Sequence, residues 1–339
     1  NVDATSDRNV FFSYNIANNN LTTGTSVGMS IAALDGSASF TKWGDGYLYI
    51  RSASSGFSGS VVIDQGAVQV NHNNALGSGP ITVNRYGILD INVANYTPTN
   101  SSLTYNDASV ERWSINGART GTVNLGKATL QVAVNQSGSA NVILDGGSIE
   151  GWLRSDDVTE TNRNAGVFRN LGENINISLA SDSLVGTQFY EGANGLDMGK
   201  QTNDNRPLEE YFGSGVILDI KGTISGTSSL TKVGYDTVIL SGANTYSGGT
   251  KVNGGRLMLG RTNALIPTGS LSTTANGVLD LNGHDQTVAG LTSPGAPTTA
   301  SVSSGFITNS ATSVNTLTVG NGASGTYAYS CAIQNNVAV

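Results

Sequence analysis

Cysteine and long apolar runs are both scarce in this sequence. The first scarcity excludes internal disulfides, and the second argues against membrane-spanning helices. The single Cys331 cannot form a disulfide within the chain, so internal cross-links do not hold it together. We expect Cys331 to be a small buried apolar residue, with a thiol that links two chains as the alternative. No run of 18 apolar residues is present, so we expect no membrane-spanning helix and no insertion into a membrane by this segment.

Charge is scarce as well. Charged residues make up only 12% of the chain, against about 25% in ordinary globular domains, and the net charge is −7. A protein that binds nucleic acid needs a positive surface to displace counterions from phosphates, so this balance argues against a nucleic-acid partner. Attachment to anionic lipid is disfavoured for the same reason. The polar surface must come from Asn, Ser and Thr, a composition typical of extracellular β-rich repeat proteins.

Helical patterns are missing, and short strand-like runs take their place. Good helix formers never recur at i, i+3, i+4 and i+7 over three turns. The chain instead has 44 glycines among short runs of β-branched and aromatic residues. We predict strands at residues 47–50, 60–63, 67–70 and 81–83. Gly and Asn supply the positive-φ corners between them.

Two parts of the chain repeat each other. Residues 36–50 read GSASFTKWGDGYLYI, and residues 226–240 read GTSSLTKVGYDTVIL. After a one-residue gap the match continues, which gives homologous units at residues 36–91 and 226–283. Many short strands could also form a sandwich or a closed barrel. Repetition and recurring turn chemistry favour a solenoid, in which corner Asn and Thr side chains hydrogen-bond one rung away. We expect roughly 20–30 residues per rung.

The middle of the chain differs in composition. Residues 150–210 are rich in charged side chains, and we interpret them as a loop-rich insertion that interrupts the rungs of a single elongated solenoid over residues 1–339. The alternative interpretation is a protruding patch that contacts a partner, because binding residues concentrate on loops held by a rigid scaffold.

Residues 241–260, SGANTYSGGTKVNGGRLMLG, carry a family resemblance. Together with the lead-in at residues 226–234, they resemble the autotransporter-associated β-strand repeat, also called the passenger-associated transport repeat. The first copy departs from that pattern at residues 52–60, SASSGFSGS. The resemblance implies an all-β, right-handed parallel β-helix exported to the bacterial outer surface. Such proteins are usually stalks, adhesins or biofilm components, and the repeat implies no catalytic residue.

Three patterns look chemical, and all are rejected. Residues 24–28 fit the spacing of a nucleophile elbow, 121–127 fit a phosphate-binding loop, and 320–325 fit a dinucleotide fingerprint. Each motif needs a helix after it, and none follows. His72, His284 and Cys331 lie too far apart for a zinc site. We therefore predict no catalytic residue, no cofactor and no metal site, with calcium as the open alternative because oxygen ligands are plentiful.

A polysaccharide lyase or hydrolase is the rival prediction, since parallel β-helices also host such enzymes. It would need paired carboxylates, and Asp156 with Asp157 is the best local pair. Trp152 and Arg154 beside them are the candidate glycan or partner contacts. Adjacent strand residues point to opposite faces, so the two carboxylates could share a site only in a loop.

A glycan-binding surface module is a third possibility. Trp113, Trp152 and Tyr211 would carry it if exposed, although large aromatics more often fill the core. Apolar strand-like segments near both termini, residues 11–16, 331–333 and 337–339, suggest head-to-tail self-association or a fragment of a longer protein. We expect a non-enzymatic, extracellular or cell-surface protein that acts as a stalk, an adhesin segment or a filament subunit.

Overall fold

A computed structural model describes most of the chain. All regular elements in the described part are β-strands. No helix within that part has the length and apolar character needed to cross a bilayer. The described residues are 2–4 and 10–12 (backbone only), 28–44, 46–152, 167–186, 216–234, 236–274, 277–293, 306–320 and 329–339.

The strands fall into two compact units, which are described one at a time. The first unit comprises Asn1–Ala140 and Tyr190–Asn205. Its strands are β1 (Val2–Ala4), β2 (Val10–Phe12), β3 (Gly28–Ile31), β4 (Leu34–Gly36), β5 (Phe40–Lys42), β6 (Tyr47–Ile50), β7 (Val61–Ile63), β8 (Gly66–Val70), β9 (Ile81–Val83), β10 (Gly87–Ile91), β11 (Leu103–Tyr105), β12 (Val110–Trp113), β13 (Gly121–Gly126) and β14 (Thr129–Val132). The predicted strands at 47–50, 60–63, 67–70 and 81–83 are β6 to β9, each placed within one residue.

The second unit comprises Asn141–Phe189 and Arg206–Val339. Its strands are β15 (Ala140–Asp145), β16 (Ser148–Gly151), β17 (Val167–Leu171), β18 (Ile175–Ser181), β19 (Ser183–Val185), β20 (Val216–Ile220), β21 (Ile224–Gly226), β22 (Leu230–Lys232), β23 (Thr237–Leu240), β24 (Thr250–Val252), β25 (Gly255–Leu259), β26 (Ser270–Thr273), β27 (Gly277–Asp280), β28 (Gln286–Val288), β29 (Gly290–Thr292), β30 (Phe306–Thr308), β31 (Asn315–Val319), β32 (Ala332–Ile333) and β33 (Val337–Ala338).

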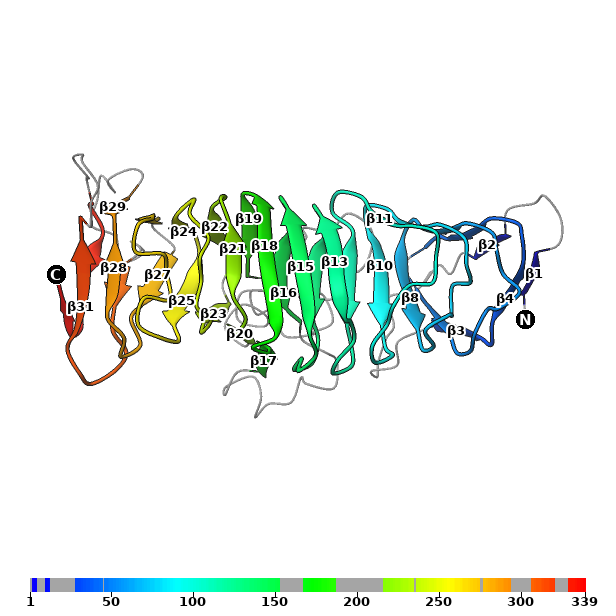
Figure 1. The fold of residues 1–339 in the computed structure, drawn as a ribbon, viewed down its shortest axis with the longest axis horizontal. Coiled ribbons are helices and arrows are strands. Elements are labelled where there is room, and N and C mark those ends of the chain that lie inside the picture. Colours follow the sequence, from blue (N-terminus) through cyan, green and yellow to red (C-terminus); the bar gives the residue numbers. More distant parts are fainter. Residues whose placement is uncertain are drawn as a thin grey trace, which may run out of the picture. The chain divides into compact units, whose positions relative to one another are not determined.

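The chain of the first unit alternates between two parallel sheets (Figure 1). Strands β5, β7, β9 and β11 are successive neighbours in one sheet, and β6, β8, β10 and β12 are successive neighbours in the other. Each of the strands β5 to β10 pairs in parallel with the strand two places further along the chain, as Phe40 with Val61 and Tyr47 with Ala67. Parallel neighbours joined in this way are coils stacked on coils, so the predicted all-β parallel β-helix is confirmed.

The second unit is built by the same rule. Strands β22, β24, β26 and β29 follow one another in one sheet, and β20, β23, β25, β27, β30 and β32 in a second. Smaller parallel groups, β15-β18-β21 and β28-β31-β33, form further faces. The described pairings in this unit are all parallel.

Both sequence repeats have the same strand plan. The six strands β5 to β10 of the first unit correspond one to one with β22 to β27 of the second. Gly66 and Gly255 begin the equivalent strands β8 and β25, with φ of 72° and 58°. A Cβ at Gly66 would clash with the backbone oxygen of Gly44 on the preceding rung, so this corner requires glycine.

Side chains alternate between the core and the surface. In β9, Ile81 and Val83 are fully buried, while Thr82 between them points outward and is half-buried. The period of two follows from the strand pleat. Each buried Ile, Leu or Val of these rows contributes about 1.5–3 kcal/mol, so the stacked aliphatic rows supply the main stabilisation of each unit.

Polar side chains at the corners hydrogen-bond to the next rung, as the sequence predicts. Asn84 Nδ2 donates to Asp64 Oδ1 at 2.9 Å, and Asn106 Nδ2 donates to Asn84 Oδ1 at 2.7 Å. Ser60 Oγ donates to Ser39 Oγ at 2.7 Å. These partners are 20 to 22 residues apart, which is the length of one rung and agrees with the predicted size.

The charged stretch at 150–210 is more regular than the sequence indicates. Its described residues 167–186 form β17, β18 and β19, which pair in parallel with β20, β21 and β22. In β18, Ile175, Ile177 and Leu179 are buried and alternate with exposed or half-buried residues. Residues 167–185 therefore lie mainly in strands, and residues 153–166 and 187–210 of the predicted insertion lie outside the described structure.

Cys331 also departs from expectation. It is half-buried rather than fully buried, and its Sγ lies 3.9 Å from the backbone oxygen of Thr273. The thiol therefore lies near the surface of the second unit.

Candidate functional site

The predicted contact residues are only partly within the described structure. Trp152 directly follows β16 and is half-buried, and its backbone oxygen accepts a hydrogen bond from Arg169 Nε at 3.2 Å. Arg154, Asp156 and Asp157 lie outside the described residues, as does Tyr211. Of the aromatic candidates for glycan contact, Trp113 is 1% exposed and belongs to the core.

A buried polar cluster surrounds Glu111 inside the first unit. The pleat of β12 turns Glu111 and Trp113 inward, and Trp113 Nε1 donates to Glu111 Oε1 at 2.6 Å. Tyr105 OH donates to the other carboxylate oxygen of Glu111. Arg119 Nε lies 3.3 Å from Glu111 Oε1. The Arg119 guanidinium carbon lies 5.3 Å from the ring centroid of Tyr96, within the range of a cation–π interaction.

Burial and charge set the ionisation of this cluster. Burial, followed by the charge of Glu111, raises the pKa of Tyr105 well above its usual value. Burial pulls the pKa of Arg119 down, but Glu111 and the two tyrosines outweigh it, so the net shift is upward. At neutral pH, Tyr105 is therefore neutral and Arg119 is charged.

This cluster has no route to a substrate. Glu111 is 0% exposed and Arg119 is 6% exposed, and a general acid or base must come within hydrogen-bond reach of the reacting group. A perturbed pKa in a cleft would indicate chemistry, but structural ion-pair networks perturb pKa values as well. The geometry supports a structural role for Glu111.

A lysine from each repeat closes a corner between rungs. Lys232 Nζ donates to three backbone oxygens, those of Val233 at 2.7 Å, Gly234 at 3.2 Å and Gly254 at 3.1 Å, and pairs with Asp236 Oδ1 at 2.8 Å. Gly254 belongs to the next rung. Both side chains of the ion pair are 0% exposed. We call this arrangement the lysine clip.

The first repeat has the carbonyl contacts of this clip. Lys42 Nζ donates to Trp43 O and to Gly44 O on its own rung, and to Gln65 O on the next rung at 2.9 Å. Burial lowers the pKa of Lys232, and the Asp236 carboxylate acts in the opposite direction. Because an unpaired buried ammonium is expensive, the carbonyls around both lysines, together with the Asp236 carboxylate at Lys232, make these side chains compatible with the core.

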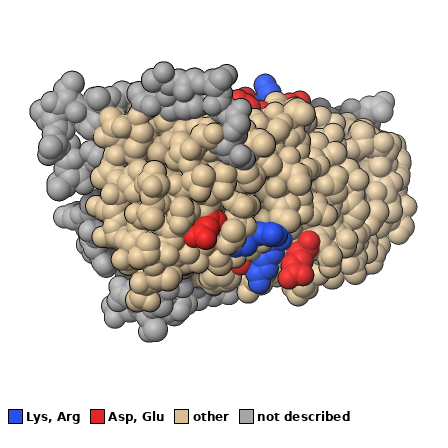
Figure 2. All heavy atoms as spheres, turned by 60° about the vertical axis from the view of Figure 1, so that its left-hand side comes forward, with Lys and Arg blue, Asp and Glu red and all other residues tan. Residues whose placement is uncertain are grey.

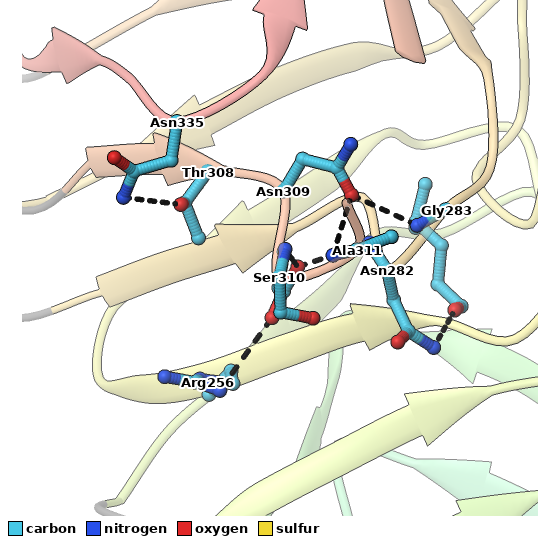
Figure 3. Close-up of polar contacts among 10 residues, drawn as sticks. Arg256, Asn282, Gly283, Thr308, Asn309, Ser310, Ala311 and Asn335 are labelled. Carbon is cyan, nitrogen blue, oxygen red and sulfur yellow. Dashed lines mark hydrogen bonds and ion pairs between the residues drawn. The ribbon is translucent and has the colours of Figure 1, made fainter. Parts of the chain in front are cut away.

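A third polar network lies where β27 ends (Figure 3). Asp280 is 0% exposed, and its Oδ1 accepts hydrogen bonds from the backbone nitrogens of Asn282 and Ser310, both at 2.9 Å. Arg256 Nη1 lies 3.5 Å from Asp280 Oδ2. Ser310 belongs to the rung that follows, and Asn309 beside it accepts from Gly283 N at 2.9 Å. These contacts fix backbone corners, which is again a structural role.

The described surface offers few charged groups. Figure 2 shows a face on which Lys, Arg, Asp and Glu occur in a few small groups among uncharged residues. No cluster of three or more His, Cys, Asp or Glu suited to a metal ion occurs among the described residues. The described part of the face in Figure 2 is therefore mainly uncharged.

Sequence reasoning missed both the buried Glu111 cluster and the lysine clips. A Thr-Lys pair stands at the same place in both aligned units, at residues 41–42 and 231–232. That coincidence was the available signal for the clips. No comparable pattern marks Glu111, because nothing in the local sequence shows that Tyr96, Tyr105 and Arg119 fold around it.

The stacked rungs, corner ladders and lysine clips place this protein among the parallel β-helix repeat proteins. Residues 40–70 and 230–259 match the model of the passenger-associated-transport-repeat, and these two segments belong to that repeat family. They span β5 to β8 and β22 to β25. The resemblance stated for the second copy is confirmed, and the divergent first copy matches as well.

One curated relative extends the comparison. Over 139 residues the chain is 33% identical to the "Adhesin BmaC autotransporter" of Brucella suis biovar 1 (strain 1330). The match covers 40% of this chain and 4% of the relative, so the chain corresponds to a small part of that protein. No solved structure matches the chain.

Proposed function

We propose that this chain is a non-enzymatic part of a bacterial autotransporter passenger that acts at the cell surface as an adhesive β-solenoid. The observation that carries the proposal is the match of two segments to the passenger-associated repeat. In support of it, the ionisable clusters around Glu111, Lys232 and Asp280 are buried in the core. The relative is named an adhesin, and adhesion is the role that a rigid, exposed polar scaffold can serve through its faces.

An adhesion assay tests this proposal. Beads coated with the purified chain would be applied to epithelial cells, to extracellular matrix and to bare plastic, with heat-unfolded chain as the matched control. We expect the folded chain to retain beads on at least one of these surfaces and the unfolded chain to retain none above background. Equal retention by both coatings on every surface would overturn the proposal.

The same preparation tests the enzymatic alternative. Acidic polysaccharides would be incubated with the wild-type chain and with Asp156→Asn and Asp157→Asn variants. We expect no change in polymer length with any of them. Cleavage by the wild type that either substitution abolishes would replace the adhesive proposal with a lyase or hydrolase.

Self-association into a stalk or filament is the finer part of the proposal. Parallel strands at the ends of a stack expose unpaired N–H and C=O groups, which pair readily with another copy. Sedimentation over a range of concentrations is the test, and we expect the mean mass to rise with concentration. A constant monomer mass would exclude the filament and leave the adhesive role in place.

A further inference from the structure

The outward face of the β5-β7-β9-β11 sheet carries mainly small polar side chains in regular rows. Parallel register aligns Thr41, Val62, Thr82 and Thr104 in one row across the four strands. Ser39, Ser60, Pro80 and Ser102 form the row on one side of it, and Trp43, Asp64, Asn84 and Asn106 the row on the other. With strands about 4.8 Å apart and alternate residues about 6.6 Å apart, the three rows form a flat lattice. We call these twelve residues the threonine face.

Five of the eight residues in the outer rows of the threonine face are joined by hydrogen bonds before any ligand arrives. Hydrogen bonds at 2.7–2.9 Å join Ser39 to Ser60, Asp64 to Asn84, and Asn84 to Asn106. The hydroxyls of Thr82 and Thr104 in the central row make no hydrogen bond to other described residues, so they are free to bind a ligand. A preorganised array loses less entropy on binding than a flexible one.

Charge restricts the kind of ligand. Asp64 is the one charged residue among the twelve, and Asn84 already occupies one of its carboxylate oxygens. Arg85 and Asp107 follow the last row at the corner, with opposite charges. A nucleic acid, an acidic glycan or an anionic lipid would find no array of cations here, and a basic peptide would find too few carboxylates. The complementary ligand is uncharged and rich in hydroxyls.

Trp43 adds an apolar platform to this grid. The Trp43 side chain is 51% exposed, compared with 44% for Phe168. An exposed indole has an apolar ring and one N–H donor, so it suits a ligand with an apolar face and polar edges. A pyranose ring has such a form, since its C–H bonds make a flat apolar face and its hydroxyls point to the edges.

We infer that the threonine face binds a neutral polysaccharide, with one sugar ring packed on Trp43 and the neighbouring sugars hydrogen-bonded across the Thr and Asn rows. This inference rests on the proposed adhesive function and names a ligand class and a site for it. The site lies wholly in the first unit and is separate from Trp152. Binding depends on shape and hydroxyl pairing, so it is insensitive to salt.

The test uses the full chain and a panel of polysaccharides in affinity gel electrophoresis. Cellulose derivatives, mannan and soluble β-glucan are the neutral probes, and alginate is the acidic probe. The variants are Trp43→Ala and Thr104→Lys. The matched control is Thr318→Lys, an exposed threonine at the equivalent outward position of β31 in the second unit. Thermal unfolding of each variant verifies that it folds.

We expect at least one neutral polysaccharide to retard the wild type and the Thr318→Lys variant. Trp43→Ala should weaken that binding by roughly tenfold or more, as for an aromatic anchor at the centre of a contact. Thr104→Lys should weaken it because a solvated charge would enter the lattice. Acrylamide quenching gives a second readout, since bound polysaccharide should protect Trp43 while buried Trp113 is unchanged.

The other outcomes overturn the inference. Neutral binding that both face variants retain would remove the site but leave adhesion intact. Absence of neutral binding by a chain that still retains beads in the adhesion assay would remove the ligand class and leave the proposed function standing. Retardation by alginate alone, abolished by salt, would contradict the charge argument and point to a basic surface elsewhere.

Discussion

The lysine clip gives the sharpest stability prediction. In Lys232→Met the side chain keeps its approximate length and loses its ammonium group. The substitution leaves Asp236 buried, with one carboxylate oxygen losing its ion pair and the other already without a hydrogen-bond partner. Three backbone oxygens lose a donor as well.

The magnitude follows from these contacts. Removing one partner of a buried ion pair costs about 3–5 kcal/mol. Each buried acceptor left without its donor adds about 1–3 kcal/mol where no other donor replaces it. We expect Lys232→Met to destabilise the second unit by at least about 4 kcal/mol, since the ion-pair cost alone reaches that range. In Lys232→Met/Asp236→Leu part of the loss should be regained, because replacing both partners by apolar groups is often neutral.

Amide hydrogen exchange is the suitable assay, because a stack of rungs need not unfold in one step. We expect faster exchange in β22 to β25 of Lys232→Met, with the amides of β5 to β8 unchanged. For Lys42→Met we expect faster exchange in β5 to β8, with the amides of β22 to β25 unchanged. A change smaller than about 1 kcal/mol at β22 to β25 would refute the role assigned to the clip, since substitutions without a structural partner fall in that range.

Three further predictions follow from the core and its corners. Burial raises the pKa of Tyr246 to about 12. The contribution of neutral Tyr246 to the free energy of unfolding is therefore present below pH 10 and is lost as the pH rises toward 12. In an alkaline denaturation profile, Tyr246→Phe should flatten the dependence of stability on pH in that range. Glu111→Leu should lower the free energy of unfolding by about 3–5 kcal/mol because it leaves Arg119 unpaired in the core, as measured in urea, and Arg119→Leu in the same background should restore part of it. Gly66→Ala should lower the melting temperature more than Gly117→Ala. The φ angle is positive at both sites, but only at Gly66 would a Cβ clash with a backbone atom. Equal shifts in melting temperature would show that the structure relieves this clash.

The strand plan was predictable because its signal is local. Strands such as Ile81–Val83 show apolar and polar residues in alternation, and the Gly or Asn after them marks the corner. The sequence repeat then predicts the architecture, because two units with the same spacing between strands are expected to form the same coils. The corner ladder of Asp64, Asn84 and Asn106 follows directly from stacking such coils.

What escaped prediction depends on contacts across the rungs. Glu111 in a strand reads as a surface residue, and it is buried because Tyr105, Trp113 and Arg119 provide polar partners inside the core. The strands within 167–186 are hard to recognise in the sequence because the charge around them is typical of loops. Trp43, which carries the proposed contact, reads as core in sequence and becomes exposed because the pleat after β5 turns it outward.

The ladders have a consequence for how such a protein can change in evolution. Because each corner side chain bonds only to the coil directly before or after it, a segment of one coil can be duplicated or deleted without disturbing distant residues. The length of such a scaffold can therefore grow or shrink in steps of about 4.8 Å, while the lattice on each face keeps its spacing.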